Sequence, residues 1–311
     1  MLALGFAVGL SACSDAGPGN GTGEGGVDEA EALRLGRVHL VLSTLPGLDD
    51  TDVDEGAPEG FELTARFAMV RGLDEEFVRA RADMPDLIED LLNPGQCAAE
   101  GALWATDLAP ELAEPGHELV LVDAGELQVQ VGDARLDVPL SLVPDLLPYM
   151  SGVEYAYFSD NGPVLDEVDA VTVAAAGGLT DDLPGFTVES PLPTAIDLSY
   201  TAEDLAELDS AGALVVRWAP ETVEDGTLGL RFTPLLGDEP VGDDILCVVS
   251  DRGQTRLELS QLRTLGLAAD ADSIRVEASR TRASLFDVGA WAGTELVVER
   301  RDVATLPLPQ R

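Results

Sequence analysis

The sequence predicts a mainly β fold of two β-sandwich-like domains with a few short helices. Short apolar or alternating runs recur along the chain, and glycine, proline and aspartate separate them. Only a few segments have the three- and four-residue apolar spacing of helices. Hydrophobic residues make up 45% of the 311 residues, which is enough for a buried core, and this length fits one large or two ordinary domains.

The chain is strongly acidic and contains no lysine. It has 58 acidic residues and 18 basic residues, all of them arginine, for a formal net charge of -40. We expect no nucleic-acid partner, because phosphates would meet a strongly negative surface. The absence of lysine also excludes a Schiff-base lysine and a P-loop.

The first residues are expected to direct the chain to export. Met1 to Leu10 are apolar or glycine, a run too short for a transmembrane helix but typical of the apolar part of a signal peptide. Because no arginine or lysine precedes this run, we interpret residues 1–12 as a truncated signal peptide.

The residues Leu10-Ser11-Ala12-Cys13 have the order of the bacterial lipobox, a leucine, two small residues and a cysteine. The chain therefore resembles bacterial lipoproteins, which implies that Cys13 is acylated, with palmitate for example, and becomes the first mature residue. Ser14 follows it, which in such lipoproteins implies sorting to the outer membrane of a Gram-negative cell. Acyl chains contribute about 0.8 kcal/mol per buried CH₂, so several hold a protein firmly. The alternative is a chance apolar N-terminus with a buried free cysteine.

Residues 13–33 are expected to form a lipid-anchored flexible tether. They are rich in glycine and acidic side chains and contain almost nothing that could pack in a core. A leader, a lipidatable cysteine and a tether thus follow one another in the order that an anchored protein needs.

The first predicted β-rich domain covers residues 34–192. Phe61 to Val70 alternates apolar and polar side chains, the period of a half-buried strand. The runs Glu118 to Val122 and Leu127 to Val131 flank turn residues, which favours a hairpin in a meander. The other predicted strands of this domain are Val38–Leu42, Arg135–Leu142, Tyr155–Phe158, Ala170–Ala174 and Phe186–Glu189.

A short helical insert is expected within this domain. Asp74 to Ala82 and Pro85 to Leu92 have apolar residues at helical spacing, and Pro85 is suited to a first helical turn. Two further short helices are expected later in the chain. The first follows the capping-box-like sequence Thr201-Ala202-Glu203-Asp204 and ends at Gly212, and the second covers Ser260 to Leu265.

Two prolines in the stretch Ser190-Pro191-Leu192-Pro193-Thr194 suggest a break, after which residues 193–304 form a second sandwich and 305–311 a tail. Its strands are expected at Leu214–Trp218, Leu228–Phe232, Ile245–Val249, Thr255–Leu259, Ile274–Arg280 and Glu295–Arg300. The run Val215-Val216-Arg217-Trp218-Ala219-Pro220 resembles an early strand of fibronectin type III domains. This resemblance implies an Ig-like second domain.

With Cys13 assigned to lipid, Cys97 and Cys247 remain as a pair in an exported chain. An oxidising compartment favours a disulfide between them. Cys247 lies in an apolar strand-like run, where a buried free thiol is equally natural. Both alternatives remain open from the sequence.

No catalytic residue can be named from the sequence. His39 lies in an apolar strand and His117 in a turn, where core packing or loop exposure is expected. The motifs G-x-S-x-G, H-E-x-x-H and S-x-x-K are absent. A carboxylate-dependent glycan hydrolase stays open, because the many acidic residues offer numerous pairs and nothing distinguishes one of them.

One acidic loop is a weak candidate for a metal site. Asp50, Asp52 and Asp54 have the spacing of the first EF-hand ligands. The pattern then fails, because Gly56 falls one place late and Phe61 stands where a bidentate glutamate is needed. We therefore expect a solvated loop and no cofactor, with calcium as the alternative.

The lipobox, the acidic tether and the arginine-only basic set together resemble uncharacterised outer-membrane lipoproteins of myxobacteria and their relatives. That resemblance implies no activity. We expect a lipid-anchored cell-envelope protein with a non-enzymatic binding or structural role, a membrane contact through its lipid and an unidentified envelope protein as partner. The alternatives are the glycan hydrolase and a calcium-assisted adhesion module.

Overall fold

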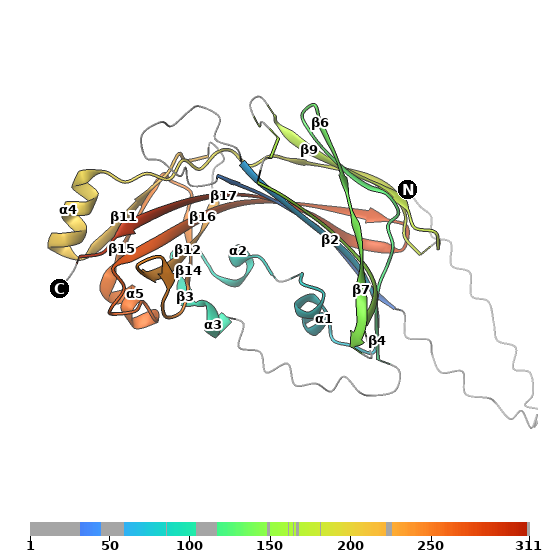
Figure 1. The fold of residues 1–311 in the computed structure, drawn as a ribbon, viewed down its shortest axis with the longest axis horizontal. Helices are drawn as coiled ribbons and strands as arrows, with labels where there is room; N and C mark the ends of the chain where they lie inside the picture. Colours follow the sequence, from blue (N-terminus) through green and yellow to red (C-terminus); the bar gives the residue numbers. More distant parts are fainter. Residues whose placement is uncertain are drawn as a thin grey trace, which may run out of the picture. The chain divides into compact units, whose positions relative to one another are not determined.

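The computed structural model describes residues 32–309 except 45–58, 85, 104–116, 148–149, 161, 164, 166–167, 181 and 222–225. The described residues belong to one compact unit, Ala32–Arg311. The prediction of a mainly β fold is confirmed, with two sandwich-like packing regions described below (Figure 1). No helix in the described part of the chain is long and apolar enough to cross a membrane.

An 11-stranded mixed sheet, here called the large sheet, forms the framework. The pairs β1–β17 and β4–β8 are parallel, and the other pairs are antiparallel. Ten strands follow one another as β3 (Cys97–Ala99), β14 (Ile245–Ser250), β12 (Thr227–Leu236), β16 (Ser273–Val288), β17 (Trp291–Pro307), β1 (Leu33–Thr44), β2 (Glu59–Arg71), β4 (Glu118–Leu121), β8 (Met150–Ser159) and β7 (Leu140–Leu147), and β13 (Glu239–Pro240) pairs with β12.

A four-stranded sheet packs on one face of the large sheet. Its order is β10 (Pro184–Pro191), β9 (Ala170–Gly177), β5 (Leu127–Val131) and β6 (Ala134–Val138). This four-stranded sheet is here called the small sheet. Alternate residues of β1 and β2, such as Leu40 and Leu63, pack against Val129 and Val173 of the small sheet and form the first core. The period of two in the sequence places these side chains on the same face.

A second core joins the other end of the large sheet to a two-stranded sheet of β11 (Ala213–Arg217) and β15 (Gln254–Glu258). The helices α4 (Ala202–Ala211) and α5 (Leu259–Leu265) contribute Leu208 and Leu262 to it. The long strand β17 belongs to both cores, because its Leu296 lies in the first and its Leu306 in the second. The large sheet therefore crosses the boundary expected near residue 192.

The opposite face of the large sheet carries the helices α1 (Glu75–Arg81) and α2 (Ile88–Leu91). Figure 1 shows both on the other side of β2 and β17 from β6 and β9. Phe77 and Val78 of α1 form a third core with Ala68 of β2, whereas the preceding Phe67 lies in the first core. Neighbouring residues of a strand point to opposite faces, so β2 is covered on both sides.

The expected helices are confirmed with shorter bounds in places. Asp74 caps α1 and accepts hydrogen bonds from the N–H groups of residues 76 and 77. Thr201 and Asp204 form a capping box at the start of α4, and Gly212 ends it with a positive φ of 67°. The helix expected over 85–92 is shorter, at Ile88–Leu91, and α3 (Glu100–Leu103) was not expected.

The predicted hairpin between residues 118–122 and 127–131 is wrong. The two strands lie in different sheets, β4 in the large sheet and β5 in the small one. Gly125 between them has a φ of +76°, and a Cβ there would lie 2.3 Å from the carbonyl oxygen of Gly177. The Tyr155 hydroxyl accepts a hydrogen bond from the Ala124 N–H at 2.9 Å. These contacts direct the chain from one sheet to the other.

The expected C-terminal tail also needs correction. Strand β17 continues to Pro307, and Leu306 and Leu308 are buried in the second core. Residues 305–308 therefore belong to the folded body, because their alternate apolar side chains extend the strand pattern. The Ig-like character of the second region stays a prediction.

Candidate functional site

The structure places the expected site residues in different situations. Cys13 and the acidic loop residues Asp50, Asp52 and Asp54 lie outside the described residues. Cys97 and Cys247 are joined by a disulfide with an S–S distance of 2.02 Å. The two cysteines lie opposite each other in the pairing of β3 with β14. The sequence left a disulfide and a buried free thiol as alternatives, and the structure contains the disulfide.

The face of the large sheet that carries α1 and α2 is polar at its centre. Arg37 and His39 alternate with apolar residues on β1, and Glu299 and Arg301 lie two residues apart on β17. The parallel pairing of these strands aligns Arg37 with Glu295 and His39 with Val297. Charged side chains of strands distant in sequence therefore gather on one face.

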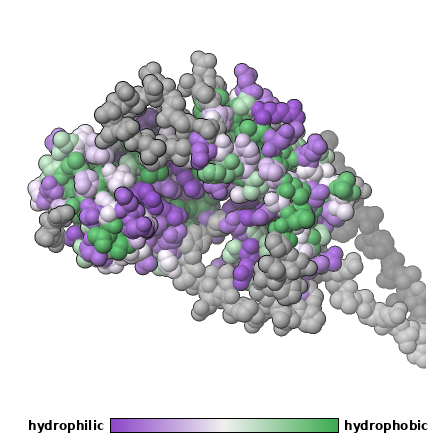
Figure 2. All heavy atoms as spheres, in the orientation of Figure 1, coloured by the Kyte–Doolittle hydropathy of each residue, from purple (hydrophilic) through white to green (hydrophobic). Residues whose placement is uncertain are grey.

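A small cleft lies between this face and the segment that leads from α1 to α2. Its volume is about 130 Å³. Figure 2 shows hydrophilic side chains gathered near the middle of the view. The cleft is lined by Arg37, His39, Asp83, Asp86, Leu87, Ile88, Glu89, Arg231, Ser279, Thr281, Glu299 and Arg301.

The Glu299 carboxylate holds two cationic or potentially cationic groups of the cleft. His39 Nε2 lies 2.9 Å from Glu299 Oε2, and Arg301 Nε donates to Glu299 Oε1 at 2.7 Å. Burial opposes ionisation of Glu299, but the hydrogen bonds from His39 and Arg301 outweigh it and lower its pKa to about 2. Glu299 is therefore ionised at neutral pH.

The other arginines that line the cleft are also paired with acids. Arg37 contacts Glu295 at 2.5 Å. Arg231 contacts Glu100 at 3.1 Å and Asp244 at 3.4 Å. The positive charges of the cleft are thus balanced by carboxylates of the protein itself.

Glu89 is different, because among the described residues it forms no ion pair. Its Oε1 accepts a hydrogen bond from Thr281 at 3.3 Å. A Cβ on Gly229 would come within 3.5 Å of this oxygen and 2.6 Å of Ser279 Oγ, so the glycine leaves room for the carboxyl group. Burial and the nearby charge of Glu299 raise the pKa of Glu89 to about 7.

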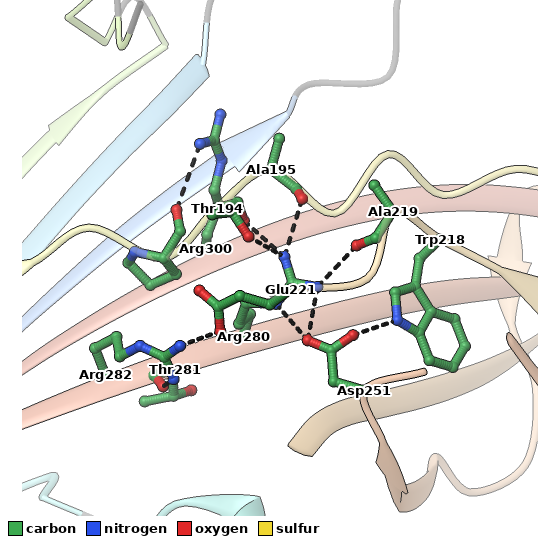
Figure 3. A network of polar contacts seen from close by, with 11 residues as sticks. Thr194, Ala195, Trp218, Ala219, Glu221, Asp251, Arg280, Thr281, Arg282 and Arg300 are labelled. Atoms are coloured by element: carbon green, nitrogen blue, oxygen red, sulfur yellow. Dashed lines mark hydrogen bonds and ion pairs between the residues drawn. The ribbon is translucent and has the colours of Figure 1, made fainter. Parts of the chain in front are cut away.

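A second charged cluster, shown in Figure 3, has a structural role. The fully buried Arg280 contacts Asp251 at 2.8 Å and donates to the carbonyl oxygens of Thr194, Ala195 and Ala219, each at 2.9 Å. Trp218 Nε1 donates to the other oxygen of Asp251 at 2.6 Å. The charges of Arg280 and Asp251 are both satisfied within the protein, so this cluster fastens loops to the sheet.

A largely apolar pocket of about 340 Å³ lies beside the disulfide and α5, lined by Gly95, Cys97, Leu257, Gln261, Leu262, Thr264 and Leu265. Within the described ranges, no group of three or more His, Cys, Asp or Glu residues could hold a metal ion. The charged cleft remains the candidate site with groups able to recognise a polar ligand.

Sequence reasoning missed Glu89 and did not single out His39 as a site residue. Glu89 is one of many acidic residues, and its setting depends on strands that are brought together over more than a hundred residues of chain. The alternation of Arg37 and His39 on one strand face was a usable signal of a polar face. His117 precedes β4 and is not among the residues that line the cleft.

No family model matches the chain, and neither a curated protein nor a solved structure matches it.

Proposed function

We propose that the protein is a lipid-anchored binding protein of the bacterial cell envelope that holds a small polar ligand in the charged cleft. The observation that carries the binding role is the partly buried Glu89 carboxyl group, which faces the cleft without an ion-pair partner among the described residues. A buried charge without a partner is destabilising, and a bound ligand can supply the missing partner.

Anchoring is supported by the order of residues at the N-terminus, where an apolar run, the lipobox and an acidic tether precede the folded body. Metabolic labelling with a fatty acid tests it. Wild type should incorporate the label and Cys13→Ala should not. Equal labelling of both proteins would contradict lipidation at Cys13.

Binding in the cleft can be tested with a variant that narrows it. Gly229→Ala places a methyl group near Ser279 and Glu89, whereas Gly101→Ala adds the same group where nothing lies within 4 Å. A panel of small cations, anions and neutral polyols would be titrated against each protein by calorimetry and NMR. We expect a solute that binds wild type and Gly101→Ala but not Gly229→Ala. Binding unaffected by Gly229→Ala would place the ligand elsewhere.

A second candidate function is a carboxylate-dependent glycan hydrolase. It is favoured by one observation, that the cleft contains a carboxyl group with a pKa of about 7 and another that is fully ionised. Such a pair can serve as acid and base. Release of reducing sugar from glycans by wild type, lost in Glu89→Gln, would support this activity. Absence of release would favour the binding role.

A further inference from the structure

The balance of charge in the cleft indicates what kind of ligand it takes. Arg37, Arg231 and Arg301 each contact at least one carboxylate of the protein. Their charges are therefore already compensated within the protein, although Arg231 Nε has no hydrogen-bond partner among the described residues. Glu89 has only the Thr281 hydroxyl and its own backbone as hydrogen-bond partners among the described residues.

We infer that the cleft binds a small organic cation, an ammonium or guanidinium group, through the Glu89 carboxylate. This inference rests on the proposed binding function of the same cleft. The cation donates hydrogen bonds to Glu89, and the hydroxyl oxygens of Ser279 and Thr281 line the same space. The ion pair replaces the compensation that the protein does not supply.

The size of the cleft limits the group that can enter. About 130 Å³ corresponds to roughly four water molecules at ~30 Å³ each. An ammonium with a short carbon stem or one guanidinium group fits this space, with the rest of a larger molecule outside. The net charge of -40 adds a long-range attraction for cations.

The charges around Glu89 determine how binding depends on pH. On the sheet, the charged or titratable groups that line the cleft are Arg37, His39, Arg231, Glu299 and Arg301, and on the segment that carries Glu89 they are Asp83 and Asp86. Asp90, which follows Glu89 in the chain, is exposed and is not among the residues that line the cleft. A cation binds the ionised form of Glu89. Affinity should therefore rise as pH increases through the region near 7 and level off above it.

Methylammonium chloride is a suitable probe, with tetramethylammonium as a cation that lacks N–H donors and sodium acetate as an anion. Wild type should bind methylammonium about tenfold more tightly at pH 8 than at pH 6, because the ionised fraction of a group with a pKa near 7 changes by about that factor. Glu89→Gln should lose this binding and its pH dependence. Asp90→Asn removes the same charge at an exposed neighbouring position and should keep both.

A second measurement does not depend on a folded variant. The carboxyl ¹³C signal of Glu89, followed in wild type, reports its pKa directly. Methylammonium should lower this pKa, whereas a bound anion would raise it. Acetate or a neutral solute that binds in the cleft in place of methylammonium would overturn the inference and leave the proposed function intact. No binding by any solute of the panel would overturn both.

Discussion

Glu89 and Glu299 line the same cleft, and their pKa values are shifted in opposite directions. The pKa of Glu299 is lowered to about 2, so its contribution to stability is present above its ordinary value of 4.5 and is lost as pH falls toward 2. The pKa of Glu89 is raised to about 7, so between 4.5 and 7 the folded state binds more protons than the unfolded state. Stability from this group therefore falls as pH rises through that window.

The variant Glu89→Gln tests the direction in which Glu89 changes stability with pH. The variant keeps the shape of the neutral carboxyl group and removes its ionisation. Its free energy of unfolding relative to wild type should increase by about 2 kcal/mol from pH 4 to pH 8, since one pKa unit corresponds to about 1.4 kcal/mol and partial exposure screens the charge. Urea unfolding at several pH values measures it. A difference that stays constant with pH would contradict the raised pKa.

Arg280 is the residue whose loss should be most damaging. Arg280→Met leaves the Asp251 carboxylate buried without its cation, which typically costs about 3–5 kcal/mol. Arg71→Met removes an exposed partner of Glu118 and should change the free energy of unfolding by less than ~1 kcal/mol. Chemical denaturation of both variants provides the comparison. Equal losses would show that burial of the Arg280 pair is not the decisive factor.

At the scale of elements, the start of α4 depends on a short-range signal. Thr201→Ala removes the side-chain oxygen that accepts from the Asp204 N–H, and should lower the free energy of unfolding by about 1 kcal/mol. Ser210→Ala, at an exposed position in the same helix, should have a small effect. Thermal unfolding of the two variants tests the cap. A larger loss of stability in Ser210→Ala than in Thr201→Ala would contradict the role of Thr201 as a helix cap.

The difference between local signals and long-range pairing explains which features the sequence could predict. Alternation in Phe61–Val70 and the cap residues Thr201 and Gly212 act within a few residues, so strands and helix ends were predictable. Sheet membership was not, because the turn at Gly125 leads to a different sheet instead of a hairpin. The cleft depends on such long-range pairing, and therefore Glu89 could not be distinguished from other acids.

At the scale of the whole molecule, β16 and β17 connect the two sandwich-like cores. Trp291 lies in the first core and Trp218 in the second. Because the strands are continuous, we expect both cores to unfold in one transition. In each variant that keeps only one of these two tryptophans, with Trp104 replaced as well, the denaturation midpoint by fluorescence should coincide with the midpoint by far-UV circular dichroism of the same variant. Two separate midpoints would indicate independently folding domains.

The pairing of β1 with β17 has a consequence for folding of the chain. Strand β1 is held between β2 and β17, so one of its two hydrogen-bonding edges has no partner until residues 295–301 are available. Contacts between such distant parts of a chain slow folding. The chain must therefore keep the open edge of this apolar strand from associating with other molecules until β17 is available to pair with it.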